Sequence, residues 1–218
     1  MKTLIIVDVQ NDFMPSGALE VPDGNTIIPV INDIQCQFDL VVATQDWHPQ
    51  HHLSFASNHP GTKPFDKIML GGQEQTLWPD HCVQGSVGAQ FHHRLNTLMV
   101  EAIFRKGTNP EIDSYSGFYD NQHQKNTGLA GYLRDKGASE LYFCGLCADI
   151  CVYFTIKDAV AEGFTCYLIE DATRALVEEN FNRIKKELTS KGVGMIKSRE
   201  LSFPQKREPL SEITPRFD

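Results

Sequence analysis

Short, continuous runs of apolar residues recur along the chain. Six of them, rich in β-branched or aromatic residues, span residues 3–9, 39–45, 100–105, 140–146, 165–170 and 193–198. Runs of this kind are typical of strands buried on both faces of a parallel sheet. Between the runs, apolar positions show helical spacing near residues 25–37, 88–98, 127–137, 149–162 and 173–191. This alternation predicts an α/β fold.

The length and composition of the chain fit one domain. It has 218 residues, of which 41% are hydrophobic, enough for a sizeable core. We expect a single domain over residues 1–198. Residues 199–218 are rich in proline and charge and are predicted to form a C-terminal extension that crosses the surface or a neighbouring subunit, so a homo-oligomer remains open.

Charge and hydropathy exclude several classes of partner. The net charge of -8, without a long basic run, disfavours nucleic acid and anionic membranes, and a small-molecule ligand fits better. No run reaches the roughly 18 apolar residues needed to cross a bilayer, and the first run is too short for a secretion signal. Several of the six cysteines lie in apolar runs. We therefore expect free thiols and a cytoplasmic protein.

Two connections are longer than an α/β unit requires, namely residues 46–87 and 107–126. Loops longer than roughly 15 residues without secondary structure of their own are usually functional or disordered. Both contain aromatic residues and tight turns. Because open parallel sheets bind ligands at the carboxyl ends of their strands, we expect these loops to form the walls of a site.

The first long loop carries a candidate metal site in the stretch TQDWHPQHHLSFASNHPG, residues 44–61. On an extended backbone, alternate side chains share one face, so Asp46 and His48 can bind the same ion. His81 offers a third ligand from the far end of the loop, and His52 could be a fourth. Carboxylate and imidazole ligands suit zinc, iron or manganese. The alternative is a solvated histidine-rich loop.

Three further reactive side chains lie at the ends of predicted strands: Asp8, Lys106 and Cys151. Burial would raise the pKa of Asp8 toward the range of a general base. Cys151 begins a predicted helix, where unpaired N–H groups and the helix dipole favour a thiolate and can stabilise an oxyanion. The alternatives are a turn aspartate, a solvated lysine and a buried helix cysteine, or a redox or zinc pair formed by Cys144 and Cys147.

Five separated motifs carry a family resemblance that runs from residue 4 to about residue 175. They read LIIVDVQNDFMPSGALEVPDG, VVATQDWHPQHHLSFAS, LWPDHCVQGSVGAQFH, FRKGTNPEIDSYSGF and CGLCADICVYFTIKDA. The chain resembles the nicotinamidase branch of the isochorismatase-like cysteine hydrolases. The resemblance implies a three-layer α/β/α domain with a mainly parallel six-stranded sheet. It also implies hydrolysis of nicotinamide to nicotinate and ammonia in NAD salvage, with pyrazinamide as a further substrate.

The same resemblance assigns roles to individual residues. It implies a catalytic triad of Asp8, Lys106 and Cys151. It places one divalent metal ion, zinc first and iron or manganese as alternatives, on Asp46, His48 and His81, with His52 as an optional ligand or a group beside the ligands. The backbone N–H groups of Cys147 and Cys151 become the oxyanion donors, and a cis peptide bond joins Leu146 to Cys147. Phe13, Trp78 and Tyr115 become the substrate-binding residues.

Two positions depart from the family pattern, and two rival functions remain. Ile150 stands where the family often has histidine or tyrosine, and Cys147 stands where a small residue is usual. These departures bear on substrate range and on sensitivity to oxidation. The rivals are another amide or N-carbamoyl hydrolase of the same fold and a non-catalytic small-molecule-binding member.

Overall fold

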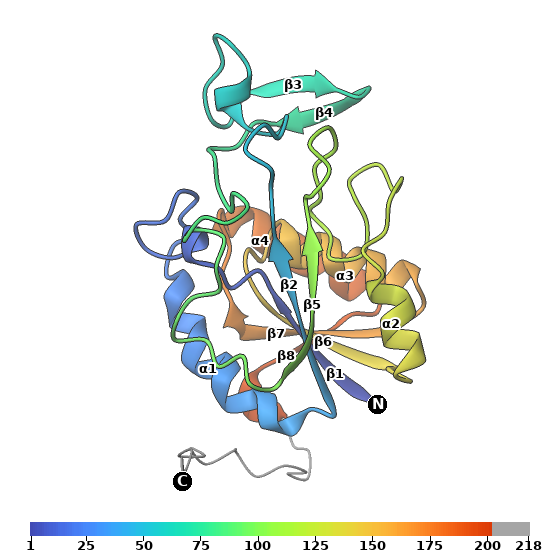
Figure 1. Ribbon diagram of the computed structural model, residues 1–218. Helices are drawn as coiled ribbons and strands as arrows, with labels where there is room; N and C mark the ends of the chain where they lie inside the picture. The colour runs from blue at the N-terminus through green and yellow to red at the C-terminus, as the bar shows by residue number, and fades with distance from the viewer. Residues whose placement is uncertain (202–218) are drawn as a thin grey trace, which may run out of the picture.

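A six-stranded parallel sheet forms the centre of the computed structural model, which describes residues 1–201 (Figure 1). The strand order is β5-β2-β1-β6-β7-β8, and every neighbouring pair is parallel. The strands are β1 (Lys2–Val7), β2 (Leu40–Asp46), β5 (Val100–Lys106), β6 (Glu140–Gly145), β7 (Thr165–Thr173) and β8 (Gly194–Ile196). Each of the six predicted runs overlaps one of these strands, so the predicted α/β fold with a mainly parallel sheet is confirmed.

Four α-helices cover the two faces of this sheet. They are α1 (Ile27–Ile34), α2 (Leu129–Asp135), α3 (Cys151–Ala161) and α4 (Glu178–Ser190). Alternate side chains of a strand point to opposite faces, so Leu4 and Ile6 of β1 pack in the core that contains α1. Ile5 and Val7 pack in the second core, with α2, α3 and α4. The result is the expected three-layer α/β/α arrangement.

The strand order creates a crevice at one end of the sheet. From β1 the chain moves outward through β2 to β5 and then returns to β6 on the other side of β1. In open α/β sheets, ligands bind where the strand order reverses in this way, beyond the carboxyl ends of the strands. Asp8 follows β1, and Cys151 follows β6 after a short loop. Register pairs Asp46 of β2 directly with Lys106 of β5.

The helix predicted for residues 88–98 is wrong. This segment consists of turns and a single antiparallel bridge between Gln10 and Phe91. Its carbonyl groups serve other parts of the chain, since the side chains of Gln10 and Gln45 both donate to the carbonyl oxygen of Ala89. Side chains of α1 and of the turn after it donate to two further carbonyls in the segment. Tertiary hydrogen bonds thus replace the helical ones.

The first long connection contains a β-hairpin that the apolar pattern did not predict. Its strands are β3 (Lys67–Leu70) and β4 (Gln73–Thr76), joined by Gly71 and Gly72. A two-glycine turn is a hairpin signal, but the flanking residues are mostly polar and the strands are largely exposed. The hairpin stands beyond the carboxyl end of the sheet (Figure 1). The remaining elements are short 3-10 helices: η1 (Asn11–Phe13), η2 (Gly24–Thr26), η3 (Gln35–Gln37), η4 (Ala56–Asn58) and η5 (Ser198–Glu200).

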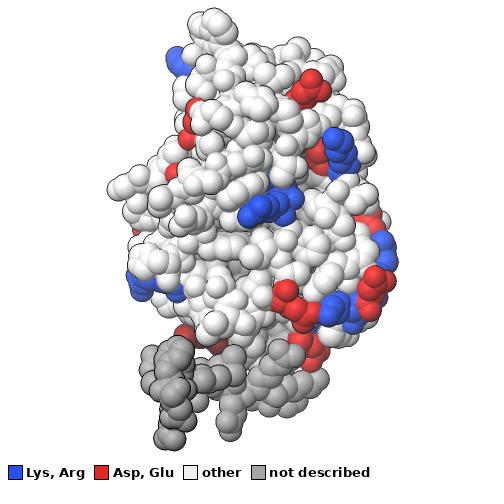
Figure 2. Space-filling view, in the orientation of Figure 1, with Lys and Arg blue, Asp and Glu red and all other residues white. Residues whose placement is uncertain are grey.

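The surface carries charged side chains of both signs (Figure 2). Over the face drawn in Figure 2, basic and acidic side chains are interspersed among uncharged ones. None of the helices formed by residues 1–201 is both long and apolar enough to span a bilayer. The single domain over residues 1–198 stays a prediction. The predicted extension over residues 199–218 lies outside the described residues from residue 202 onward.

Candidate active site

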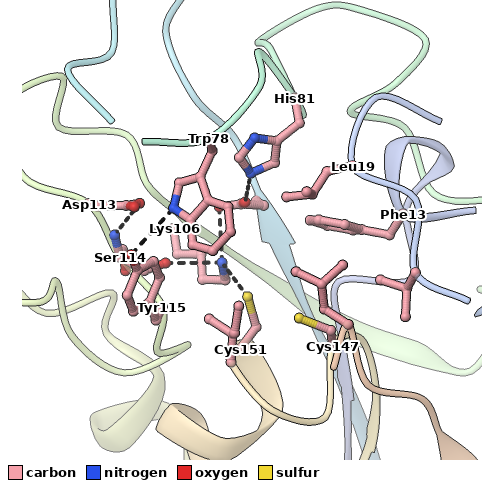
Figure 3. A pocket seen from close by; sticks show the side chains of 14 residues that line it. Phe13, Leu19, Trp78, His81, Lys106, Asp113, Ser114, Tyr115, Cys147 and Cys151 are labelled. Carbon is pink, nitrogen blue, oxygen red and sulfur yellow. Dashed lines mark hydrogen bonds and ion pairs between the residues drawn. The ribbon is translucent and has the colours of Figure 1, made fainter. Parts of the chain in front are cut away.

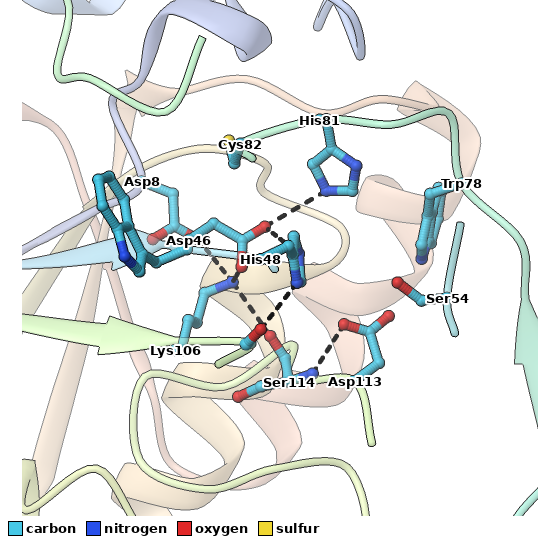
Figure 4. A network of polar contacts seen from close by, with 12 residues as sticks. Asp8, Asp46, His48, Ser54, Trp78, His81, Cys82, Lys106, Asp113 and Ser114 are labelled. Atoms are coloured by element: carbon cyan, nitrogen blue, oxygen red, sulfur yellow. Dashed lines mark hydrogen bonds and ion pairs between the residues drawn. The ribbon is translucent and has the colours of Figure 1, made fainter. Parts of the chain in front are cut away.

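A buried lysine lies at the centre of the site (Figure 4). The Nζ atom of Lys106 is 2.9 Å from Asp8 Oδ2 and 3.0 Å from Asp46 Oδ1. It also donates to the carbonyl oxygen of Ser114 at 3.0 Å and lies 3.6 Å from Cys151 Sγ. Burial by itself would lower the pKa of Lys106, but Asp46 and Asp8 raise it well above its usual value. The ammonium group therefore stays charged and contacts every other ionisable group of the predicted triad.

Asp8 is held in one orientation by its neighbours. It follows β1 with a left-handed backbone, φ 47°, and its side chain is fully buried. Thr44 donates a hydrogen bond of 2.6 Å to Oδ1, while Oδ2 faces Lys106. Burial raises the pKa of Asp8, although the charge of Lys106 opposes this. The predicted direction is thus confirmed, and the carboxylate is a stronger base than an exposed one.

Cys151 is the first residue of α3, as predicted, but its thiol is not activated by that position alone. The neighbouring side chain of Cys147, followed by burial, raises the pKa of Cys151 well above its usual value. Lys106 acts in the opposite direction. The expectation that the helix start favours a thiolate is therefore wrong for the resting site, because desolvation and the neighbouring thiol outweigh it. A base must remove the proton.

Two backbone N–H groups next to the thiol have no acceptor. The peptide bond between Leu146 and Cys147 is cis, as the resemblance implies. Within residues 1–201, neither the N–H of Cys147 nor that of Cys151 donates a hydrogen bond. The neighbouring N–H of Val152 is satisfied by the carbonyl oxygen of Cys147 at 3.1 Å. Unpaired buried donors are uncommon, and these two are free to bind an anionic oxygen.

Asp46, His48 and His81 form a group suited to a metal ion. Their ligand atoms all lie within 4.8 Å of one another, with Asp46 Oδ2 3.0 Å from His48 Nε2 and 3.3 Å from His81 Nε2. Each histidine has Nδ1 next to a carbonyl oxygen, that of Gly107 at 3.0 Å for His48 and that of Pro79 at 2.8 Å for His81. A carbonyl oxygen only accepts, so Nδ1 carries a hydrogen in each ring and Nε2 is the atom directed at the carboxylate. Burial by itself would lower the pKa of His48, but Asp46 raises it above its usual value, so positive charge at Nε2 is favoured.

This arrangement needs a cation between the three groups. Burial by itself would raise the pKa of Asp46, but His48 and Lys106 keep it well below its usual range, so the carboxylate is ionised. Two Nε2 atoms and one negative oxygen then face the same small volume, where a proton on Nε2, or a metal ion in its place, compensates the carboxylate. A divalent ion would satisfy all three, and carboxylate plus two imidazoles is a donor set that zinc accepts. The residues present therefore fit the predicted metal.

His52 has the opposite orientation. Its Nδ1 atom accepts the backbone N–H of Ser54 at 3.1 Å and lies 2.7 Å from the Ser54 hydroxyl. Because a backbone N–H only donates, Nε2 carries the hydrogen of the neutral ring, and burial lowers the pKa of His52 to about 4. Nε2 is buried without a hydrogen-bond partner. His52 therefore offers a proton to the site, whereas His48 and His81 offer lone pairs.

Polar residues that the sequence analysis did not select hold the loops together. The side-chain amide of Gln10 donates to the carbonyl oxygen of Asp46 and accepts its N–H, both at 2.8 Å. Asp12 accepts the N–H of Cys82 at 2.7 Å and so fixes the chain next to His81. The sequence feature that could have identified Gln10 and Asp12 is their spacing, since they follow Asp8 at two-residue steps.

A pocket with aromatic walls opens directly above the thiol (Figure 3). Phe13, Trp78 and Tyr115, the predicted substrate-binding residues, all line it. Trp78 Nε1 donates to the hydroxyl of Tyr115 at 3.3 Å, which fixes two of the walls. Six further residues that the sequence analysis did not assign to the substrate pocket complete the lining: Leu19, Val21, Asp113, Ser114, Ile150 and Leu176. The cavity suits a small, flat and largely apolar ring.

All predicted site residues meet at this place. Asp46, His81, Lys106, Cys147 and Cys151 line the cavity together with the three aromatic residues. Asp8, His48 and His52 lie directly behind them.

The alternative pairing of Cys144 with Cys147 is not supported. Cys144 lies in β6 with its sulfur 3.7 Å from the carbonyl oxygen of Ile5, both cysteines are free thiols, and no cysteine belongs to a potential metal group within residues 1–201.

Comparisons with known proteins agree with this geometry. The isochorismatase domain model matches residues 2–200. A nicotinamidase from Acinetobacter baylyi is 45% identical over 199 residues, which is 91% of this chain and 93% of the relative. A solved nicotinamidase/pyrazinamidase from Acinetobacter baumanii has a TM-score of 0.89 at 44% identity, covering 92% of this chain and 98% of that one. A pyrazinamidase from Pyrococcus horikoshii, solved in complex with zinc, has a TM-score of 0.74 at 38% identity and covers 90% and 98%.

Gly107 provides a test of the metal site. It has a φ of +67°, and a Cβ atom there would lie 2.4 Å from Cε1 and 2.6 Å from Nδ1 of His48. We expect Gly107→Ala to displace His48 and to lower the affinity for zinc at least about tenfold, measured by competition with a chromophoric chelator.

Gly163→Ala is the matched control, because Gly163 has a φ of +86° with nothing within 4 Å of the added atom. It should cost about 1 kcal/mol of stability through backbone strain and leave zinc binding unchanged. Equal zinc affinity in the two variants would contradict the assignment of His48.

Proposed function

The chain belongs to the isochorismatase domain family, and we propose that it is a nicotinamidase that hydrolyses nicotinamide to nicotinate and ammonia. One observation carries this proposal: a buried thiol, carboxylate and ammonium meet at the base of an aromatic cavity whose wall contains a metal-binding group. The reaction would serve NAD salvage, and pyrazinamide, which has the same carboxamide on a similar ring, is expected as a second substrate.

In the acylation step, Asp8 acts as the general base. It takes the proton of Cys151 as Sγ bonds to the carboxamide carbon, which removes the need for a free thiolate in the resting site. The N–H groups of Cys147 and Cys151 bind the oxygen as its negative charge develops. Asp8 then returns the proton to the amide nitrogen, the C–N bond breaks, and ammonia leaves a thioester on Cys151. Lys106 holds Asp8 and the thiol in place throughout.

In the deacylation step, water attacks the thioester. Asp8 takes one proton from the water, the same two N–H groups bind the oxygen, and the C–S bond breaks to release nicotinic acid, which loses the second proton of the water to become nicotinate. The proton on Asp8 returns to Sγ and restores the resting thiol.

The aromatic walls position the ring of the substrate. Phe13 and Trp78 provide the flat surfaces against which a pyridine ring packs, and Tyr115 borders it. Holding the ring in this way places the carboxamide above Cys151. Rotational and translational entropy is then lost when the substrate binds and not in the chemical step, which lowers the barrier of that step.

A metal ion held by Asp46, His48 and His81 supplies Lewis acidity toward the pyridine nitrogen and toward water. We propose zinc as this ion, supported by the ligand set and by the zinc-bound pyrazinamidase of similar structure. We assign His52 as a hydrogen-bond donor to a water in the site and not as a ligand, since its lone pair is used by Ser54.

The thiols support the predicted location of the enzyme. All six cysteines are free. Such thiols persist in reducing compartments, which supports a cytoplasmic protein.

Replacing the nucleophile tests the reaction. We expect Cys151→Ala to lower ammonia release from nicotinamide at least about 1,000-fold because no thioester can form, while the zinc content stays equal to that of the unmodified protein. Cys36→Ala serves as the control and should keep full activity, since Cys36 is half-buried in η3 and does not line the cavity. Ammonia release by Cys151→Ala at the original rate would rule out the proposed mechanism.

Two histidine variants separate the ligands from the donor. We expect His48→Ala to lower zinc affinity at least about 100-fold, because it removes a directed lone pair. His52→Gln keeps an N–H donor and should hold zinc within about tenfold of the original affinity. Equilibrium dialysis with metal analysis measures both. If His52→Gln lost zinc as His48→Ala does, His52 would have to be counted as a ligand.

A further inference from the structure

The side chain of Cys147 has no part in the proposed mechanism, which uses only its backbone N–H. Its thiol nevertheless lines the same cavity as the thiol of Cys151, and both sulfur atoms point into the base of that cavity (Figure 3). We infer that Cys147 and Cys151 form a reversible disulfide when the enzyme meets a peroxide, and that this bond switches the active site off. The inference rests on the proposed role of Cys151 as the nucleophile.

The backbone keeps these two cysteines close. The carbonyl oxygen of Cys147 accepts the N–H of Ile150 at 3.2 Å and that of Val152 at 3.1 Å, so Cys151 lies inside a hydrogen-bonded turn that begins at Cys147. Closing this turn brings together two cysteines that are four residues apart in the sequence. A disulfide requires such closeness, with about 4.4–6.8 Å between the two Cα atoms. The side chain of Cys147 is also the largest cause of the raised pKa of Cys151, ahead of burial.

The other cysteines have different surroundings. Cys36, Cys82, Cys144 and Cys166 do not line the cavity. Cys144 faces the carbonyl oxygen of Ile5 and Cys166 that of Phe164, both within the folded core. Among the described residues, Cys147 is therefore the thiol placed to react with an oxidised Cys151.

The chemistry balances with hydrogen peroxide as the oxidant. Cys151 Sγ attacks one peroxide oxygen as Asp8 takes its proton, the O–O bond breaks, and a sulfenic acid and one water form. The thiol of Cys147 then attacks the sulfenic sulfur, the S–S bond forms, and the hydroxyl leaves as a second water with the remaining proton. The two thiols together lose two electrons, and the peroxide gains them. A dithiol such as dithiothreitol reverses the change.

The second thiol protects the first from irreversible oxidation. A lone sulfenic acid in this cavity would be open to further oxidation to a sulfinic or sulfonic acid, which thiols do not reduce. Trapping it as a disulfide with Cys147 prevents that damage. The same bond removes the nucleophile, so hydrolysis stops until a reductant returns.

The experiment treats the zinc-loaded enzyme with hydrogen peroxide and follows ammonia release from nicotinamide together with peptide mass spectrometry. We expect activity to fall at least about tenfold, a Cys147–Cys151 linked peptide to appear, and dithiothreitol to restore most of the activity. Each protein is compared with its own untreated activity. Cys147→Ala should lose activity in peroxide and recover less than about a fifth of it, with added oxygen on Cys151 in place of the link.

Cys36→Ser is the matched control and should behave like the unmodified enzyme, because its thiol lies outside the cavity. Two results would overturn the inference and leave the nicotinamidase proposal intact. One is that an enzyme active before treatment yields no linked peptide after peroxide. The other is that Cys147→Ala and the unmodified protein recover the same fraction of activity. A linked peptide without loss of activity would also overturn it. If the untreated protein releases no ammonia, the proposed function is contradicted instead. The presence or absence of the linked peptide in the mass spectrum would then test the disulfide by itself.

Discussion

The ammonium group of Lys106, buried between two carboxylates and a thiol, is the interaction on which the rest of the site depends. It pairs with Asp8 and Asp46 at about the distance of a hydrogen bond, with almost no exposure to solvent. Removing one partner from such a buried pair costs about 3–5 kcal/mol, because the other charge is left without compensation. Here a single lysine serves two anions, and positive charge on His48, or a metal ion beside Asp46, would offset the second of them.

This shared lysine couples the two halves of the site. Asp46 uses one oxygen for Lys106 and the other for the two histidines, so the metal-binding group and the catalytic groups share one carboxylate. A change in the charge at the metal site therefore reaches Asp8 through Lys106, without any movement of the backbone. The position of Asp8, the protonation of the Cys151 thiol and the charge of the metal-binding group are parts of a single electrostatic arrangement.

The fold supplies the rigidity that this arrangement requires. The carboxyl ends of three neighbouring parallel strands carry the charged groups of the site: Asp8, Asp46 and Lys106. Cys151 begins the helix that follows β6, the next strand of the sheet. Both faces of the sheet are covered, so the strand ends cannot shift without disrupting a packed core. The histidine loop is less regular, and it is held by side-chain bonds from Gln10 and Asp12, residues that lie just beyond the base.

The residue pattern alone determined the class of fold, the six strands and the identity of the reactive groups, because burial in a parallel sheet leaves continuous apolar runs and because reactive residues ended those runs. It could not determine the conformation of residues 88–98, where Gln10, Gln45 and side chains near α1 take the carbonyl groups that a helix would use. Nor could it distinguish His52 from His48 and His81, since their roles depend on which ring nitrogen meets a carbonyl oxygen and which meets an N–H. Tertiary structure likewise decided the protonation of the Cys151 thiol, through the neighbouring Cys147 and burial. It also decided the proximity of Cys151 to Cys147, because the spacing of residues in the sequence does not specify the geometry of the turn that joins them.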